Sequence, residues 1–83
     1  MSDTEWAETA EAELRRQQRT RRVPDLLAEE LLGLVVPIVG APRDGRAWGG
    51  VIRKMASEGA LLRVGFRPAR SSNGSAKPVW RSV

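Results

Sequence analysis

The sequence predicts a small α+β domain, mainly α, in which three helices are followed by a two-stranded β-hairpin. Two observations carry this prediction. Apolar residues recur with the helical period in three successive stretches of the first 59 residues. After them, Leu62, Val64 and Phe66 alternate with polar or small residues, and Asn73-Gly74 is a turn signal ahead of a second extended stretch. A chain of 83 residues forms one small domain, which we place over residues 1–83.

The first predicted helix lies within residues 1–22. Ser2 is its expected N-cap, because a glutamate three residues later completes a capping box. Its apolar face is thin, and we expect Trp6 and Leu14 to dock it on the rest of the domain. The helix is expected to run to about Arg19, and its arginine-rich end, residues 15–22, to fray or to project in part. It is either a solvated face or a supporting phosphate contact.

The second predicted helix covers residues 24–35. Pro24 suits the first helical position, where a missing N–H needs no partner, and Pro37 is expected to end the helix. Three acidic residues are expected to face outward: Asp25, Glu29 and Glu30. Nucleic acid would repel this face, so we assign the helix to support. The apolar surplus of residues 31–39 is either core or the surface of a homodimer.

The third predicted helix, residues 44–58, is amphipathic and basic. Asp44 is its expected N-cap, and Gly59 occupies the position at which a glycine ends a helix. Four residues form the predicted core face: Trp48, Val51, Ile52 and Met55. Gly49 and Gly50 lower the helix propensity. They permit either tight packing between helices or close approach to DNA.

The predicted hairpin covers residues 60–81. Leu62, Val64 and Phe66 should form one apolar side of its first strand. Pro78 cannot donate a hydrogen bond within a sheet, so the return strand should be an edge strand or begin at this residue. The loop between the strands is polar and contains an arginine.

Composition excludes several classes of protein. The chain has no cysteine and no histidine, which removes disulfides, Cys/His zinc sites and the usual acid–base residue. No carboxylates converge in an apolar setting, so we expect no enzyme, no metal, no cofactor and no small-molecule ligand. The apolar runs are too short to span a membrane, and the acidic start does not resemble a signal peptide. We expect a cytoplasmic protein.

Charge is distributed unevenly along the chain. Residues 1–13 carry −5, residues 14–23 carry +5, residues 24–42 carry −3 and residues 43–83 carry +7. The positive C-terminal half indicates a polyanionic partner. Twelve of the fourteen basic residues are arginine, which suits bidentate phosphate and guanine contacts, although a GC-rich genome explains the same bias.

Three helices with a basic third helix, followed by a basic hairpin, match a winged helix-turn-helix. In that geometry the third helix enters the major groove of double-stranded DNA, and the wing follows the backbone or minor groove. The residues expected to contact DNA lie on the polar face of the third helix and on the wing: Arg43, Arg46, Gly50, Arg53, Lys54, Ser57, Arg67, Arg70, Ser71, Ser72, Asn73 and Lys77.

The C-terminal half also resembles a known family. The segment RAWGGVIRKMASEG at residues 46–59, Arg67-Pro68, a loop of Ser, Asn and Gly, and the final Pro-Val-Trp-Arg of residues 78–81 resemble small winged-helix proteins of actinobacterial phages and prophages. The likeness covers about residues 43–83 and implies DNA binding. We expect a phage or prophage transcription regulator, and the resemblance places it in the cytoplasm or nucleoid of a bacterial host cell. The alternatives are an excisionase-like recombination accessory factor and a protein-interaction adaptor.

Overall fold

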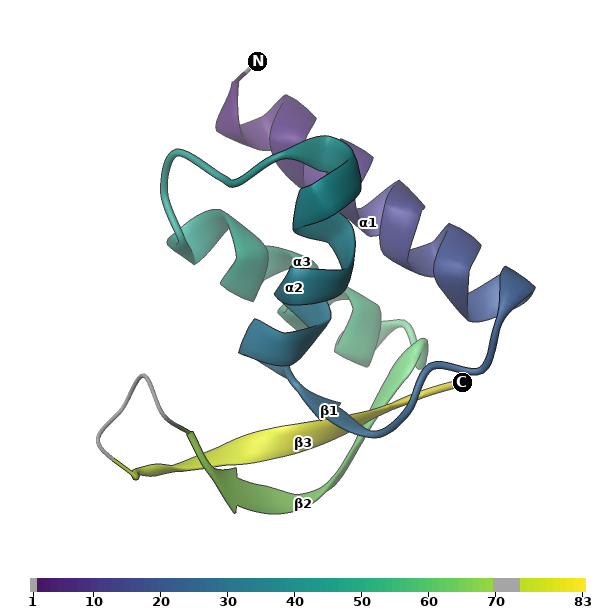
Figure 1. The fold of residues 1–83 in the computed structure, drawn as a ribbon, viewed down its shortest axis with the longest axis vertical. Helices are drawn as coiled ribbons and strands as arrows, with labels where there is room; N and C mark the ends of the chain where they lie inside the picture. Colours follow the sequence, from purple (N-terminus) through teal and green to yellow (C-terminus); the bar gives the residue numbers. More distant parts are fainter. Residues whose placement is uncertain (1, 70–73) are drawn as a thin grey trace.

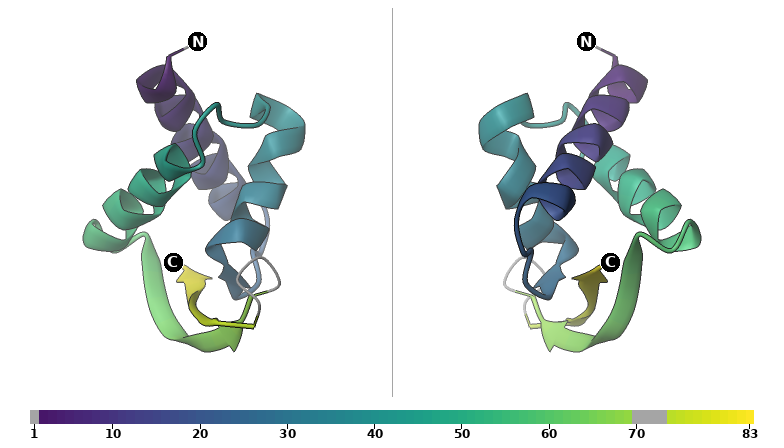
Figure 2. Two further views of the ribbon diagram at one scale, coloured as in Figure 1. Left: turned by 90° about the vertical axis from the view of Figure 1, so that its left-hand side faces the viewer. Right: turned by 90° about the vertical axis from the view of Figure 1, so that its right-hand side faces the viewer.

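The protein forms three helices that pack around one core, with a three-stranded antiparallel sheet at one end of the helices (Figures 1 and 2). The structure is a computed structural model, and it describes residues 2–69 and 74–83. The elements in chain order are α1 (Asp3–Thr20), β1 (Leu26–Leu27), α2 (Ala28–Val39), α3 (Arg46–Ser57), β2 (Leu61–Pro68) and β3 (Ala76–Ser82). The α+β class is confirmed, but the sheet has three strands where a two-stranded hairpin was predicted.

The additional strand, β1, lies where the sequence predicted the first turn of the second helix. Leu26 pairs with Trp80 and Leu27 with Val79, so β3 supplies hydrogen-bonding partners to an extended backbone at this point. Leu27 is also buried, which favours the strand further. The helix therefore starts at Ala28, four residues after the predicted start.

The C-terminal end of α2 also differs from the prediction. Pro37 lies inside the helix, which continues to Val39 and ends at Gly40 with a φ of 84°. A proline at this position removes the hydrogen bond to the Gly33 carbonyl. Both residues are exposed, so water can reach that carbonyl, and the lost bond does not end the helix.

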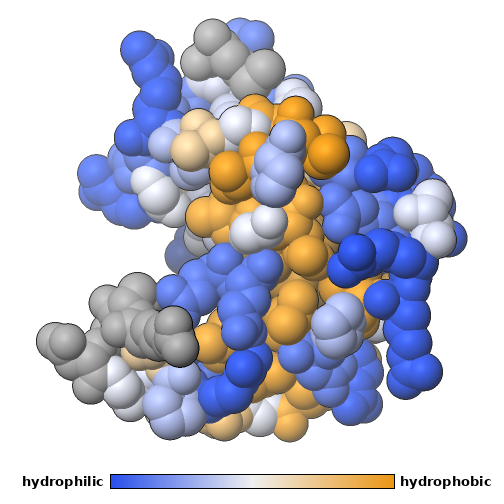
Figure 3. Space-filling view, in the orientation of Figure 1, coloured by the Kyte–Doolittle hydropathy of each residue, from blue (hydrophilic) through white to orange (hydrophobic). Residues whose placement is uncertain are grey.

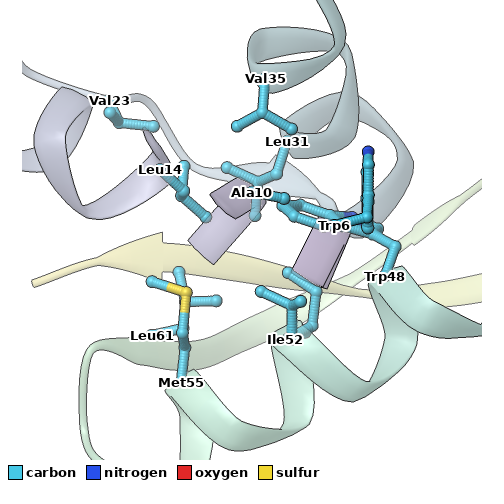
Figure 4. Packing of buried hydrophobic residues seen from close by; sticks show 11 residues of the cluster. Trp6, Ala10, Leu14, Val23, Leu31, Val35, Trp48, Ile52, Met55 and Leu61 are labelled. Carbon is cyan, nitrogen blue, oxygen red and sulfur yellow. The ribbon is translucent and has the colours of Figure 1, made fainter. Parts of the chain in front are cut away.

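Two tryptophans organise the core, and they fix both ends of α2 (Figure 4). The Trp6 and Trp48 rings meet edge to face, with centroids 6.1 Å apart and an interplanar angle of 73°. Trp6 Nε1 donates to the Gly40 carbonyl at 2.9 Å, and Trp48 Nε1 donates to the Ala28 carbonyl at 2.7 Å. The predicted core position of Trp48 is confirmed, and Trp80 is partly buried against the same cluster.

Helix α1 docks as predicted and stays helical through the first part of its basic end. The Ser2 hydroxyl accepts a hydrogen bond from the Glu5 N–H at 3.2 Å, and Trp6 and Leu14 are buried. The helix continues to Thr20, which agrees with the predicted end at about Arg19, and the backbone becomes extended at Arg21. Ion pairs of the first arginines with acidic residues account for this order.

A buried polar pair that the periodicity did not predict joins α1 to α2. Gln17 Nε2 donates to Glu13 Oε2 at 2.8 Å and to the Leu34 carbonyl at 2.9 Å. Arg16 Nη2 donates to the same carboxylate at 2.6 Å. Hydrogen bonds from Arg16 and then Gln17 lower the pKa of Glu13 from 4.5 to about 2.

Helix α3 begins and ends with the predicted signals. The Asp44 carboxylate accepts a hydrogen bond from the Arg46 N–H at 2.9 Å, although the N-cap position itself is Gly45. At the other end, Gly59 has a φ of 79° and follows the last turn as a Schellman glycine, with the Ala60 N–H bonded to the carbonyl of Met55 at 2.8 Å. The helix spans 46–57, within the predicted 44–58.

The hairpin forms, but its first strand has no single apolar side. Leu62 pairs with Arg81 and Phe66 with Pro78, with a bulge at Val64 between them. Since the two partners lie on opposite faces of β3, the bulge places Leu62 and Phe66 on opposite faces of β2. All three apolar residues are exposed, and the buried residue of the strand is Leu61 instead.

Strand β3 is central, with β1 and β2 on its two sides, so the predicted edge position is wrong. Pro78 is nevertheless tolerated, because β1 pairs only with Val79 and Trp80. At Pro78 the strand has a partner on the β2 side alone, and its missing N–H costs no bond to β1.

Candidate nucleic-acid interface

The outward face of α3 carries the arginines that the sequence assigned to DNA. Four buried residues fix the rotation of this helix: Trp48, Val51, Ile52 and Met55. Arg46, Arg53 and Ser57 are all exposed on the opposite face, at spacings of seven and four residues. The three side chains therefore form one line along the helix.

Only part of this line is held by contacts within the protein. The Arg46 side chain is 92% exposed, and its Nη2 lies 3.3 Å from Asp44 Oδ2. Ser57 Oγ donates to the Lys54 carbonyl at 2.8 Å. Arg53 forms no ion pair with the described residues, so its guanidinium is available to an external partner.

Two exposed glycines lie between Arg46 and Arg53. A Cβ atom added at Gly49 or Gly50 would meet no neighbour within 4 Å in the described parts of the chain, apart from its own helix backbone. Packing between helices therefore does not require either glycine. Each costs about 0.5–1 kcal/mol relative to alanine inside a helix. The helix backbone of α3 is thus uncovered between two arginines, and no contact within the described structure requires glycine there.

Lys54 faces α1 and is engaged there. Its ammonium donates to both carboxylate oxygens of Glu11, at 3.0 and 3.2 Å, and these hydrogen bonds raise the pKa of Lys54. Arg15 of α1 pairs with the same Glu11 and also with Glu58 just after α3. Lys54 therefore holds α3 against α1.

The predicted wing residues divide into three groups. Arg67 forms an ion pair with Glu30 at the start of α2, so its charge is already partly neutralised. Lys77 is exposed and lies opposite Arg67 in the ladder. The remaining four predicted contacts lie outside the described residues: Arg70, Ser71, Ser72 and Asn73.

The acidic residues near the start of α2 have a different role from the one expected. The Asp25 carboxylate accepts from Arg81 Nη2 at 3.0 Å, and Glu30 accepts from the Leu27 N–H at 2.9 Å as well as from Arg67. They tie α2 to the sheet in addition to facing solvent. The partners lie 37 and 56 positions away in the sequence, and periodicity carries no signal for such pairs.

The α2 side of the molecule differs in character from the α3 face. Figure 3 shows apolar residues in a band down the middle of this side, over α2. Ile38, near the end of α2, is 62% exposed.

Arg43 is exposed in the segment before α3 and lines a small pocket with Trp6 and Asp3. On α3 and in the segment before it, the exposed basic residues without an ion pair to another helix or strand of the described structure are Arg43, Arg46 and Arg53.

Neither the structure nor the comparisons assign a function by themselves. Within residues 2–69 and 74–83, no helix is long and apolar enough to cross a membrane. The same residues contain no group of three or more acidic side chains arranged to hold a metal ion. No family model matches the sequence. Comparison with curated proteins found no match, and comparison with solved structures found none either.

Proposed function

We propose that the protein binds double-stranded DNA with the outward face of α3 in the major groove. The observation that carries this proposal is the exposed Gly49-Gly50 pair between Arg46 and Arg53. Two glycines at adjacent exposed positions weaken a helix, and they are useful where a partner approaches the helix backbone closely. The flanking guanidiniums suit an anionic partner, and arginine forms bidentate contacts with guanine and phosphate.

The order of elements supports a winged helix-turn-helix arrangement. A basic third helix is followed directly by the β2–β3 hairpin, which would act as the wing on the DNA backbone. Four basic residues among the predicted DNA contacts lie in the described part of the chain and form no ion pair with another helix or strand: Arg43, Arg46, Arg53 and Lys77. If these four groups neutralise phosphates, the logarithm of affinity should fall with the logarithm of salt with a slope of about −4.

For the biological role we propose a transcription regulator of a phage or prophage, on the resemblance of residues 43–83 to such winged-helix proteins. A recombination accessory factor of the excisionase kind is the alternative within DNA binding. The two differ in how they occupy DNA. A regulator protects one operator, whereas an accessory factor binds several adjacent sites cooperatively and bends the DNA.

The test compares two arginine variants in a fluorescence anisotropy titration with duplex DNA. Arg53→Gln should weaken binding about tenfold, the equivalent of one charge-assisted hydrogen bond, and should reduce the salt slope by about 1. Arg19→Gln removes the same charge from the exposed end of α1 and should leave both quantities nearly unchanged. Binding that does not weaken with added salt would contradict the proposal, as would equal losses in the two variants.

One observation favours a protein-interaction adaptor as the second candidate. Leu62, Val64 and Phe66 are 42–62% exposed on β2, an edge strand of the sheet. An adaptor would lose its protein partner in a Phe66→Ser variant while any affinity for DNA stayed the same. A regulator that acts through DNA alone would be unaffected by this substitution.

A further inference from the structure

A second basic region lies away from the outward face of α3, where the segment after α1 meets the end of β3. The chain between α1 and β1 lies beside the C-terminal end of β3 (Figure 1), and a cleft of about 550 Å³ opens between them. Arg21 and Arg22 line it from one side, and Arg81 and Ser82 from the other. None of these residues belongs to the proposed DNA contacts of α3.

The cleft has an excess of positive charge. Asp25 is the single acidic side chain among its lining residues, against three arginines. Arg81 uses Nε and Nη2 on that carboxylate, at 3.2 and 3.0 Å, which leaves its other terminal nitrogen outside the pair. Arg21 and Arg22 form no ion pair within the described chain. The hydrogen bond from Arg81, with the charge of Arg22 nearby, lowers the pKa of Asp25.

The arginine run at the end of α1 is thereby divided into two parts. Arg15 and Arg16 are neutralised by glutamates within the helix region, at N–O distances of 2.9 and 2.6 Å. Arg21 and Arg22 follow the last helical turn and line the cleft. The first two arginines stabilise the fold, and the last two keep an unneutralised charge within the described chain.

A buried hydroxyl adds an independent observation. Ser82 Oγ is shielded from solvent and has no hydrogen-bond partner among the atoms that the structure describes. It is the one side-chain atom of this kind found in the described residues. A buried polar group normally has a partner, since leaving it without one costs free energy. Ser82 lines the same cleft as the arginines.

We propose that this cleft is an anion-binding site that takes a phosphate group, held by Arg21, Arg22 and Arg81, and that binding uncovers the shielded Ser82 hydroxyl, which then acts as a further donor. A guanidinium binds phosphate oxygens through two parallel N–H donors, and a hydroxyl supplies a third kind of donor. The phosphate belongs either to a DNA backbone or to a free phosphate-bearing molecule. The site is independent of DNA binding by α3.

Thermal unfolding in inorganic phosphate, against chloride at matched ionic strength, tests the site. Phosphate should raise the melting temperature of the wild-type chain. Ser82→Ala should leave the melting temperature in chloride unchanged or higher, because an unpartnered buried hydroxyl is removed. The same variant should reduce the rise that phosphate causes. A fall in stability in chloride with an unchanged response to phosphate would overturn the role of Ser82.

Matched arginine variants separate the cleft from general surface charge. Arg22→Gln should raise the dissociation constant for phosphate about tenfold, as expected for one lost charge-assisted hydrogen bond. Arg19→Gln removes a charge three residues earlier but outside the cleft, and phosphate affinity should be retained. Equal losses in the two variants, or the same stabilisation by chloride, would overturn the proposal.

Competition with DNA identifies the source of the phosphate. The amide NMR signals of Arg22 and Ser82 should move on addition of phosphate, and a short duplex is then added to the saturated protein. Displacement of phosphate would assign the site to a DNA backbone. Simultaneous binding would assign it to a free phosphate-bearing molecule. An absence of shifts at these residues in both titrations would overturn the site itself.

Discussion

Replacing the exposed glycines of α3 by alanine should stabilise the protein and weaken its binding to DNA. Gly50 lies inside the helix, and a Cβ atom there would meet no neighbour within 4 Å in the described structure. Alanine is favoured over glycine at such a position by about 0.5–1 kcal/mol. For a domain of this size, that gain corresponds to a rise of about 2–8 °C in melting temperature. The same gain is expected for Gly49→Ala.

The effect on DNA should have the opposite sign. If a DNA backbone or base edge approaches the helix at these glycines, an added methyl group enters a close-packed contact. Overpacking of this kind costs about 1–3 kcal/mol, which lowers affinity by roughly 5- to 150-fold. Melting temperatures and anisotropy titrations of the same preparations provide both values.

Gly33→Ala is the matched control. Gly33 is exposed inside α2, and an added Cβ atom has no neighbour within 4 Å there either, as far as the described residues extend. It should bring the same stabilisation and leave DNA affinity unchanged. Gly49→Ala and Gly50→Ala variants that bind DNA as tightly as Gly33→Ala would refute the close-approach argument.

The remaining predictions concern the scaffold. Trp48→Ala should lower the free energy of unfolding by about 3–5 kcal/mol in a urea titration, because a large buried ring is removed; Trp48→Phe should recover most of the loss. Lys54→Gln should lower the melting temperature, because it removes the ion pair between α3 and Glu11, and it should reduce DNA affinity less than Arg53→Gln does. A larger loss of DNA affinity in Lys54→Gln than in Arg53→Gln would show that Lys54 is a DNA contact. The pKa of Glu13 is lowered from 4.5 to about 2, so the ionised carboxylate contributes fully to stability above pH 4.5 and this contribution is lost as the pH falls towards 2. Glu13→Gln should remove this part of the loss of stability in acid, as measured by urea titrations between pH 2 and pH 7. An unchanged dependence of the unfolding free energy on pH would contradict this role of Glu13.

The sequence predicted the local features of the fold well. The capping of α1 by Ser2, the glycine stop at Gly59 and the buried face of α3 all depend on residues within a few positions of one another. Each follows from helical geometry, which repeats over short distances along the chain. The line of Arg46, Arg53 and Ser57 was therefore visible before any tertiary contact was known.

Tertiary pairing decided the start of α2 and the shape of the sheet. Leu26 and Leu27 are extended because β3, more than fifty positions later, offers them backbone partners. In β2, apolar and polar residues alternate regularly in the sequence, but the bulge at Val64 places Leu62 and Phe66 on opposite faces of the strand. A pattern of apolar residues indicates whether a segment is a helix or a strand, but it does not indicate which distant strand will pair with that segment.

For the candidate site, the amino-acid sequence alone predicts which residues of α3 face outward, because helical rotation follows from the four apolar residues on its other side. Which charges remain available depends on ion pairs that form only in the folded chain. Lys54 and Arg67 were equal candidates with Arg53 until Glu11 and Glu30 were brought to them from 43 and 37 positions away. Ion pairs form through space between side chains of any separation along the chain, so the balance of free and neutralised charge is a property of the folded molecule.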